Sequence, residues 1–256
     1  MAIYGREDEQ MKRFDGAVVL VTGATRGIGR AIASAFLKEN ATLVGIYAGN
    51  EESAEAFIAE HQEAEGRIDL RRCNVADPQQ VADLFEHLET RHQRLDILVN
   101  NAGVRRDAVL AMMNDSQWQE VIDTNLTGTF LMARKAVPLM MRNKFGRIVN
   151  ITSPVARLGF AGQANYAASK AGQIALARSL AREVAKKKIT VNCVSPGFIA
   201  TDFLDGLPRE LLDEYRKMVP MRRFGTPGEV AHAVLFLCSA EAAYISGTVL
   251  EVSGGL

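Results

Sequence analysis

Short apolar runs alternate with longer segments of helical spacing along most of the chain. The apolar runs predict strands at residues 17–21, 43–46, 95–99, 147–151, 189–194 and 249–252, with a weaker candidate at 67–70. The intervening segments predict helices at 28–39, 53–65, 78–91, 117–143, 164–187 and 227–239. Because continuous apolar strands that alternate with helices are typical of parallel sheets, we expect an α/β, Rossmann-type doubly wound fold.

Two segments lie outside this alternation. Residues 1–14 are mostly polar and predict a frayed N-terminal tail, which leaves 15–256 as a single domain without an evident linker or repeat. The stretch at about 198–226 mixes apolar and charged residues and follows the carboxyl end of a strand, where such sheets bind ligands. We interpret it as a lid insertion, although a surface helical hairpin that only packs would show the same pattern.

Composition and charge exclude several classes of protein. The 256 residues are 48% hydrophobic, and 30 Lys and Arg balance 30 Asp and Glu, which is typical of a globular protein and argues against nucleic-acid binding. The chain has no signal peptide pattern and no run of 18 apolar residues, which predicts a cytoplasmic protein with no membrane segment. Its 3 cysteines and 4 histidines lack metal-ligand spacing, so we expect no metal site.

The first predicted strand runs into a glycine-rich turn. Its sequence, Thr22-Gly23-Ala24-Thr25-Arg26-Gly27-Ile28-Gly29, has the pattern G-x-x-x-G-x-G. Gly23 permits a tight turn, Gly27 lets the backbone approach a phosphate, and Gly29 lets the helix pack close to the strand. Exposed amides at a helix N-terminus favour an anion such as a pyrophosphate. The glycines alone would also fit a turn without a ligand, but their place after the first strand favours a dinucleotide.

The end of the second predicted strand indicates which dinucleotide binds. Sites for NAD place Asp or Glu about 20 residues past the glycines to hold the ribose hydroxyls, but here the strand runs into Tyr47-Ala48-Gly49-Asn50. The guanidinium of Arg26 in the glycine turn can pair with a 2′-phosphate. We therefore predict NADP(H) rather than NAD(H). Arg26 as an ordinary loop arginine, with Glu51 reaching the ribose, is the alternative.

A tyrosine and a lysine mark the candidate chemistry. Tyr166 and Lys170 are four residues apart on a predicted helix and therefore share a face, and Ser153 follows the strand at 147–151. Reduction of a carbonyl needs a hydride and a proton, and a nearby ammonium lowers the pKa of tyrosine from about 10. Ser153 can donate to the substrate oxygen, and Lys170 can also hold the nicotinamide ribose. The alternative is a surface contact between Tyr166 and Lys170, beside a serine at a strand end, without a catalytic role.

Asn125 interrupts a long predicted helix. It lies in Thr124-Asn125-Leu126-Thr127-Gly128, whose Asn, Thr and Gly are poor formers of helix interiors. We expect a local kink with an inserted water that relays protons to Lys170. Without the other motifs, Asn125 would be only a helix irregularity.

Together and in this order, these motifs resemble the short-chain dehydrogenase/reductase family. The resemblance also rests on Asn100-Asn101-Ala102-Gly103 and Pro196-Gly197, and it covers nearly everything from Gly16 onward. It implies a seven-stranded parallel sheet with helices on both faces and a catalytic tetrad of Asn125, Ser153, Tyr166 and Lys170. The cofactor-binding residues that the glycine turn and the resemblance imply are Gly23, Thr25, Arg26, Gly27, Ile28, Gly29, Asn74, Val75, Asn101, Ala102, Gly103, Tyr166, Lys170, Pro196, Gly197, Ile199 and Thr201.

Within that family the chain is most similar to 3-oxoacyl-[acyl-carrier-protein] reductases. The similarity rests on residues 162–172 and 179–184 and on the pair Arg106-Asp107. It implies NADPH-dependent reduction of a 3-oxoacyl thioester, carried on acyl carrier protein or CoA, to the 3-hydroxyacyl thioester in fatty acid biosynthesis. Carrier docking is expected at Lys144 and Lys187, or at arginines nearer the cleft.

The same similarity implies a homotetramer, with the helices at 117–143 and 164–187 forming a dimer face. Packing of these helices wholly within one subunit is the alternative. Two other functions stay open: a reductase or dehydrogenase for another ketone, a sugar or a cyclic alcohol, and an NADP-binding regulator without catalysis.

Overall fold

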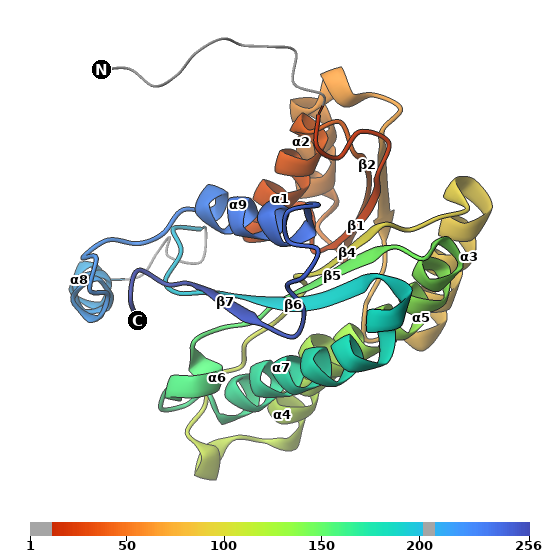
Figure 1. Ribbon diagram of the computed structural model, residues 1–256. Coiled ribbons are helices and arrows are strands. Elements are labelled where there is room, and N and C mark those ends of the chain that lie inside the picture. Colours follow the sequence, from red (N-terminus) through yellow and green to blue (C-terminus); the bar gives the residue numbers. More distant parts are fainter. Residues whose placement is uncertain (1–11, 202–207) are drawn as a thin grey trace.

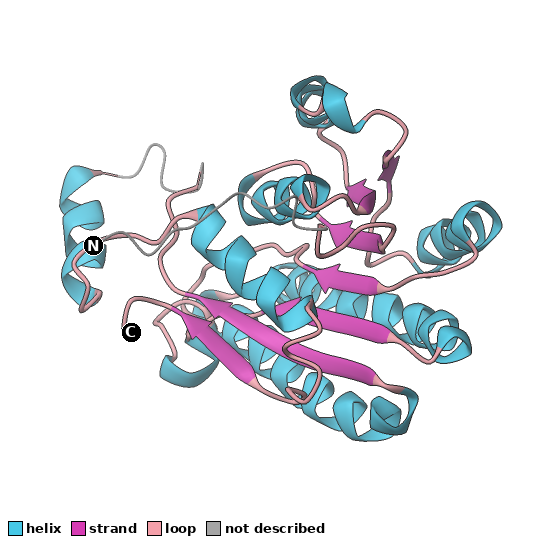
Figure 2. Cartoon of the chain, turned by 45° about the horizontal axis from the view of Figure 1, so that its top comes forward, coloured by secondary structure: helices cyan, strands magenta, loops and turns pink. Residues whose placement is uncertain are grey.

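The protein is built around one parallel seven-stranded sheet. The computed structural model describes residues 12–201 and 208–256, in which the strand order is β3-β2-β1-β4-β5-β6-β7 (Figures 1 and 2). The strands are β1 (Val18–Thr22), β2 (Thr42–Tyr47), β3 (Ile68–Arg72), β4 (Ile97–Asn100), β5 (Gly146–Ile151), β6 (Ile189–Pro196) and β7 (Val249–Val252). Every pairing between neighbours is parallel. The predicted doubly wound α/β fold is therefore confirmed, including the weak strand candidate at 67–70.

Helices cover both faces of this sheet (Figure 1). One face carries α1 (Gly27–Lys38), α2 (Glu51–Glu60) and α9 (Pro227–Cys238), and the other carries α3 (Pro78–His92), α5 (Gly128–Asn143) and α7 (Ala164–Val184). Three more helices flank the carboxyl edge or its loops: α4 (Asp115–Ile122), α6 (Val155–Leu158) and α8 (Arg209–Met218).

The alternation of side chains along β1 explains why both faces are covered. Val19 and Val21 pack into one apolar cluster with Phe36 of α1, whereas Val18 and Leu20 pack into a second cluster with α3 and α5. All five residues of β1 are buried. Successive strand residues point to opposite faces, so an uninterrupted apolar strand has to be covered on both sides.

The helix predicted at 117–143 is interrupted. A π-helical turn at Asp123–Thr127 separates α4 from α5 and contains Asn125. Gly128 follows this turn, where a Cβ atom would lie 2.7 Å from Cγ2 of Val75. The interruption lies where the sequence concentrates poor helix formers, and a π-helical turn accommodates them.

The predicted tail and lid are described only in part. Residues 1–11 and 202–207 lie outside the described residues. The prediction of a frayed tail to residue 14 needs a correction, because Phe14 is only 5% exposed and packs edge-on against Phe36, with ring centroids 4.9 Å apart. In the candidate lid, the ring of Tyr215 from α8 stacks on Phe198, with ring centroids 4.7 Å apart.

Candidate active site

The predicted site residues follow the carboxyl ends of six strands, at one edge of the sheet. In the spatial order of the strands, Asn74 follows β3, the chain at 48–51 follows β2, and the glycine turn follows β1. The loop at 101–103 follows β4, Ser153 follows β5, and the segment at 197–201 follows β6. The chain order reverses between β1 and β4, and such switch points are where doubly wound sheets bind dinucleotides.

The glycine turn has no room for larger side chains at its centre. Gly23 and Gly27 adopt positive φ angles of 67° and 53°. A Cβ atom on Gly29 would lie 1.9 Å from the carbonyl oxygen of Gly23, so only glycine lets α1 begin this close to the turn. An open backbone at a helix N-terminus is the arrangement that the sequence-based interpretation requires for a pyrophosphate, which stays a prediction.

Thr22 and Asn101 hold the turn against the loop that follows β4. Oγ1 of Thr22 accepts hydrogen bonds from the backbone N–H groups of Asn101 at 2.9 Å and Ala102 at 2.8 Å. Nδ2 of Asn101 donates to the carbonyl oxygens of Thr22 and Gly23, at 3.0 Å and 3.2 Å. The Asn101 side chain therefore braces the glycine turn. Thr22 was missed as a functional residue, although its hydroxyl in an apolar strand end is a signal that could have identified it.

The segment after β6 comes close to both the glycine turn and the C-terminal residues. A Cβ atom on Gly27 would meet Cγ2 of Thr201 at 3.6 Å, which places Thr201 against the turn. Gly197 donates its N–H to the carbonyl of Val252 at 3.0 Å, and Ile199 forms an isolated bridge with Gly225. The segment that contains Pro196, Gly197, Ile199 and Thr201 thus closes one side of the site.

Polar side chains surround the predicted adenosine end. Asn50 caps α2 by accepting the N–H of Ser53 at 2.9 Å. Arg72, at the end of β3, donates from Nε to the carbonyl of Ala48 at 3.1 Å and lies with Nη1 3.6 Å from Oε1 of Glu51. Arg72 was not among the predicted residues, because the sequence does not show that the ends of β2 and β3 are in register.

Arg26, Asn74 and Val75 lie at the same end of the site. Arg26 is the exposed N-cap residue of α1. The Oδ1 atom of Asn74 accepts the N–H of Ala76 at 3.0 Å, which folds the chain after β3, and Val75 is buried against Gly128. Thr25 is buried within the turn, whereas Ile28 packs against the core cluster of α1.

Ser153 and Tyr166 are brought together as predicted. Hydrogen bonding with Ser153 and the charge of Arg105 both lower the pKa of Tyr166, but burial outweighs them and raises it above its ordinary value. The guanidinium carbon of Arg105 lies 5.7 Å from the centroid of the Tyr166 ring. In the folded protein, burial therefore favours the neutral hydroxyl form of Tyr166, which is the form that can donate a proton.

Lys170 is the one candidate catalytic residue with a basic side chain, and it is only 3% exposed. Its Nζ atom donates to the carbonyl of Ile151 at 2.7 Å and to Oε1 of Gln173 at 3.1 Å, and it lies 5.5 Å from the centroid of the Tyr166 ring. Burial lowers the pKa of Lys170 to about 8. A lysine with a pKa near neutrality can hold or release a proton within the working range of an enzyme.

Asn125 joins the loop after β4 to α7. Its side chain accepts the N–H of Val104 at 2.8 Å, donates to the carbonyl of Val104 at 3.0 Å and donates to Oγ of Ser169 at 3.1 Å. The Ser169 hydroxyl in turn donates to the carbonyl of Tyr166 at 2.8 Å. The Asn125 side chain therefore supports the helix that carries Tyr166. The backbone carbonyl of Asn125 is turned toward Gln173.

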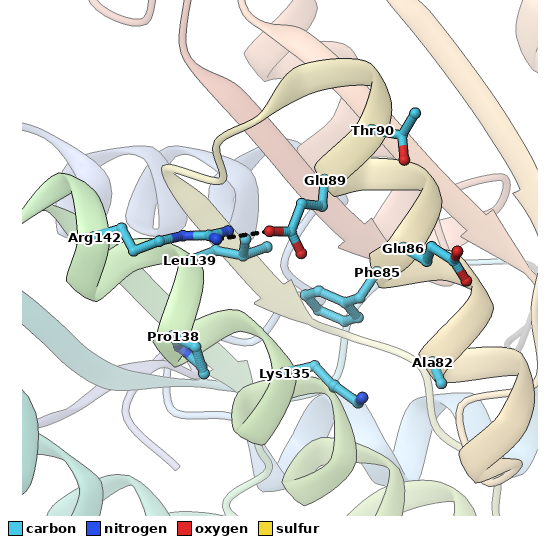
Figure 3. Close-up of a pocket in the computed structure, with 9 residues that line it drawn as sticks. All are labelled: Ala82, Phe85, Glu86, Glu89, Thr90, Lys135, Pro138, Leu139 and Arg142. Carbon is cyan, nitrogen blue, oxygen red and sulfur yellow. Dashed lines mark ion pairs between the residues drawn. The ribbon is translucent and has the colours of Figure 1, made fainter.

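A separate cavity lies away from these residues. It has a volume of about 640 Å³ between α3 and α5, where Glu89 and Arg142 form an ion pair at 2.6 Å (Figure 3). None of the residues that line it belongs to the predicted site.

In the part of the chain that the structure describes, no three His, Cys, Asp or Glu side chains gather in a metal-binding arrangement. Within the same residues, no helix is both long and apolar enough to cross a bilayer.

A glycine turn at the switch point, with a tyrosine and a lysine at the same edge of the sheet, is typical of a dinucleotide-dependent oxidoreductase. A family model described as enoyl-(acyl carrier protein) reductase matches residues 23–256. The chain belongs to the short-chain dehydrogenase/reductase family, whose members use a nicotinamide cofactor.

Curated relatives match almost the whole chain. A 3-oxoacyl-[acyl-carrier-protein] reductase of Staphylococcus aureus is 44% identical over 237 residues, which are 93% of this chain and 96% of the relative. A protein of the same name from Escherichia coli is 45% identical over 247 residues, or 95% of this chain and 98% of the relative. A third, from Thermotoga maritima, is 41% identical over 246 residues, or 95% and 99%.

Proposed function

We propose that this protein is an NADPH-dependent reductase of 3-oxoacyl thioesters in fatty acid biosynthesis. The observation that carries the proposal is the grouping of Ser153, Tyr166 and buried Lys170 at the same edge of the sheet as the glycine turn. The three relatives named as 3-oxoacyl-[acyl-carrier-protein] reductases support the substrate class. An intact proton donor favours an enzyme over a regulator, which needs only to bind the nucleotide.

The proposed chemistry divides the work among four side chains. A nicotinamide held at this site would supply the hydride that reduces the 3-carbonyl carbon of the substrate. Tyr166 donates a proton to the carbonyl oxygen, and Ser153 donates a hydrogen bond to the same oxygen as negative charge develops there. Lys170 favours the phenolate form of Tyr166 through its positive charge and binds the nicotinamide ribose. Asn125 holds the loop after β4 and the start of α7 in place.

The polar groups at the adenosine end support NADPH as the cofactor. The carboxylate of Glu51 lies 3.6 Å from Arg72, so it is offset by a guanidinium rather than left to hold ribose hydroxyls. Arg26 and Arg72 supply two positive charges at the ends of β1 and β3, on both sides of β2. A 2′-phosphate carries the negative charge that this environment favours.

Docking of an acyl carrier fits the arginines nearer the cleft, one of the two expected locations, better than Lys144 and Lys187. Lys144 and Lys187 precede β5 and β6 and therefore lie at the amino-terminal edge, opposite Tyr166 of the same chain. Arg105 and Arg106 follow β4, and Arg105 contacts the Tyr166 ring. We therefore assign carrier docking to the arginines near the site, where positive charge suits an acidic carrier or a CoA phosphate.

The assembly and location follow from the same proposal. Trp118 of α4 and Phe130 and Met141 of α5 are 40%, 42% and 37% exposed. Apolar side chains of this size on neighbouring helices favour a subunit contact, so we retain the dimer face and the homotetramer. A cytoplasmic location suits a step that uses NADPH and carrier-bound acyl chains.

One comparison of substrates tests the proposed reaction. NADPH oxidation is followed with acetoacetyl-CoA, which offers a 3-carbonyl, and with crotonyl-CoA, which offers the double bond that an enoyl reductase would reduce. We expect turnover of acetoacetyl-CoA and negligible turnover of crotonyl-CoA. The reverse preference would contradict the proposal in favour of enoyl reduction, and turnover of only sugars or cyclic alcohols would contradict both. NADH in place of NADPH should support slower turnover at limiting cofactor.

A further inference from the structure

Gln173 lies at the centre of a buried polar network behind the candidate site. It is 0% exposed and lies on α7, three residues after Lys170. Its Oε1 atom accepts a hydrogen bond from Nζ of Lys170 at 3.1 Å. Its Nε2 atom donates to the backbone carbonyl of Asn125 at 2.8 Å and to Oγ1 of Thr129 at 2.7 Å. The hydroxyl of Thr129 donates to the same Asn125 carbonyl at 2.7 Å. One side chain thus connects Lys170 to the π-helical turn.

The orientation of the Gln173 amide follows from its partners. The ammonium of Lys170 can only donate, so it must face the amide oxygen. The carbonyl of Asn125 can only accept, so it must face the amide nitrogen. A flipped amide would oppose donor to donor and acceptor to acceptor. Every polar atom of the Gln173 side chain therefore has a partner, which makes its position well defined.

This network forms hydrogen bonds to the backbone carbonyl of Asn125, which lies in the π-helical turn. The carbonyl accepts from both Thr129 and Gln173, and the oxygen of Gln173 reaches Lys170. The Gln173 amide thus bridges Lys170 and this carbonyl directly. A carboxamide neither gains nor loses a proton near neutral pH, so it holds Lys170 at any pH in this range.

We propose that Gln173 is a positioning residue for the proposed reductase, which fixes the Lys170 ammonium relative to the π-helical turn. The inference rests on the proposed function for its catalytic consequence only. The geometry of the network also predicts that Gln173 favours the charged form of Lys170.

The other titratable groups around Lys170 do not stabilise its charged form in place of Gln173. Within the described residues, Tyr166 faces it from α7 and Cys193 faces it from β6. Burial raises the pKa of Cys193 to about 12, and burial also raises the pKa of Tyr166, so both are neutral near pH 8. The contact from β5 is the neutral carbonyl of Ile151. No full negative charge among these groups competes with the amide oxygen.

A direct titration of Lys170 tests the inference without relying on turnover. The protein, free of cofactor, is labelled with ¹³C and ¹⁵N in lysine, and the Lys170 signal is assigned by its loss in Lys170→Arg. In Gln173→Met, which has a similar size but no amide, we expect the Lys170 midpoint to fall by about one pH unit. In Gln173→Glu, which adds a negative charge, we expect it to rise by at least about one unit. Thr129→Val disturbs the same carbonyl without touching Lys170 and should leave the midpoint unchanged.

Kinetics then separate positioning from a merely structural role. In Gln173→Met, kcat for acetoacetyl-CoA should fall about tenfold, while the KM for the substrate changes little. The alkaline limb of the plot of kcat against pH should shift in the same direction as the Lys170 midpoint. An unchanged Lys170 midpoint in both Gln173 variants would overturn the inference, whatever the activity. Absence of activity in the wild-type protein together with the expected shift in midpoint would contradict the proposed function and leave the positioning of Lys170 standing.

Discussion

Nη1 of Arg72 lies 3.6 Å from Oε1 of Glu51, across the ends of β3 and β2. Glu51 is the first residue of α2 and the first carboxylate after β2. A carboxylate at this position would repel a 2′-phosphate and favour ribose hydroxyls, so the guanidinium beside it changes the preference of the site. We therefore predict that Arg72 contributes to the choice of cofactor.

Replacement of Arg72 by alanine should therefore weaken NADPH binding more than NADH binding. We expect about a tenfold increase in the Kd for NADPH and little change for NADH, because only NADPH carries the charge that Arg72 offsets. Calorimetric titration with each nucleotide gives both values. Arg71→Ala is the matched control, since Nη1 of Arg71 contacts His87 at 3.1 Å and lies 3.7 Å from Asp69. An equal loss of affinity for the two nucleotides would contradict this role.

Tyr166→Phe should abolish turnover and leave nucleotide binding intact. The substitution removes the proton donor but keeps the ring that lies against Lys170 and Arg105. We expect kcat for acetoacetyl-CoA to fall by at least about a thousandfold, within the range that general acid catalysis contributes. Fluorescence titration should give an NADPH Kd within about threefold of the wild-type value. Tyr244→Phe is the control, because Tyr244 is fully exposed and should behave as wild type. Substantial turnover in Tyr166→Phe would remove Tyr166 from the chemistry.

Gly29→Ala should disrupt the cradle itself. The added methyl group would lie 1.9 Å from the carbonyl oxygen of Gly23 and 2.5 Å from Nδ2 of Asn101, both of which the fold holds in place. We expect a loss of about 2–4 kcal/mol in the free energy of unfolding, together with weaker nucleotide binding. Gly228→Ala is the control, because its nearest neighbour, Oγ1 of Thr226, would be 3.9 Å away. Chemical denaturation of both variants decides the matter, and equal stabilities would show that the turn can relax.

The sequence predicts those parts of the site that are local in the chain. The glycine turn and the Tyr166–Lys170 pair each lie within a few residues, so spacing alone reveals them. The contact of Gln173 with the carbonyl of Asn125 spans 48 residues, and that of Asn101 with Thr22 spans 79. Such contacts depend on how strands and helices pack, and nothing in the local pattern of Gln173 distinguishes it from a surface glutamine.

The charge of Tyr166 shows a second limit of sequence reasoning. The spacing predicts that Lys170 makes the phenol acidic, yet in the folded protein burial raises the pKa of Tyr166 and lowers that of Lys170. Burial disfavours the charged form of both groups, and the depth of each side chain is a property of the packed structure. The sequence identifies candidate reacting groups, but it does not give their ionisation.

Replacement of Lys170 by methionine should make the protein more stable near neutral pH while removing its activity. The pKa of Lys170 is lowered from 10.5 to about 8, so below pH 8 the folded protein keeps an ammonium in a buried site that disfavours it. A difference of this size corresponds to about 3 kcal/mol, from which the lost hydrogen bonds to Ile151 and Gln173 subtract.

The pH dependence of that stability gain distinguishes charge from packing. Between pH 8 and 10.5 the unfolded chain binds a proton at Lys170 that the folded protein has released, so this group makes the wild-type protein more stable as pH rises. The advantage of Lys170→Met should therefore shrink by about 2 kcal/mol from about pH 7 to about pH 9.5. Urea denaturation of both proteins at the two pH values measures it, and the difference cancels groups that the two proteins share. A constant advantage would mean that Lys170 stays protonated in the folded protein up to about pH 9.5, which would contradict the lowering of its pKa by burial.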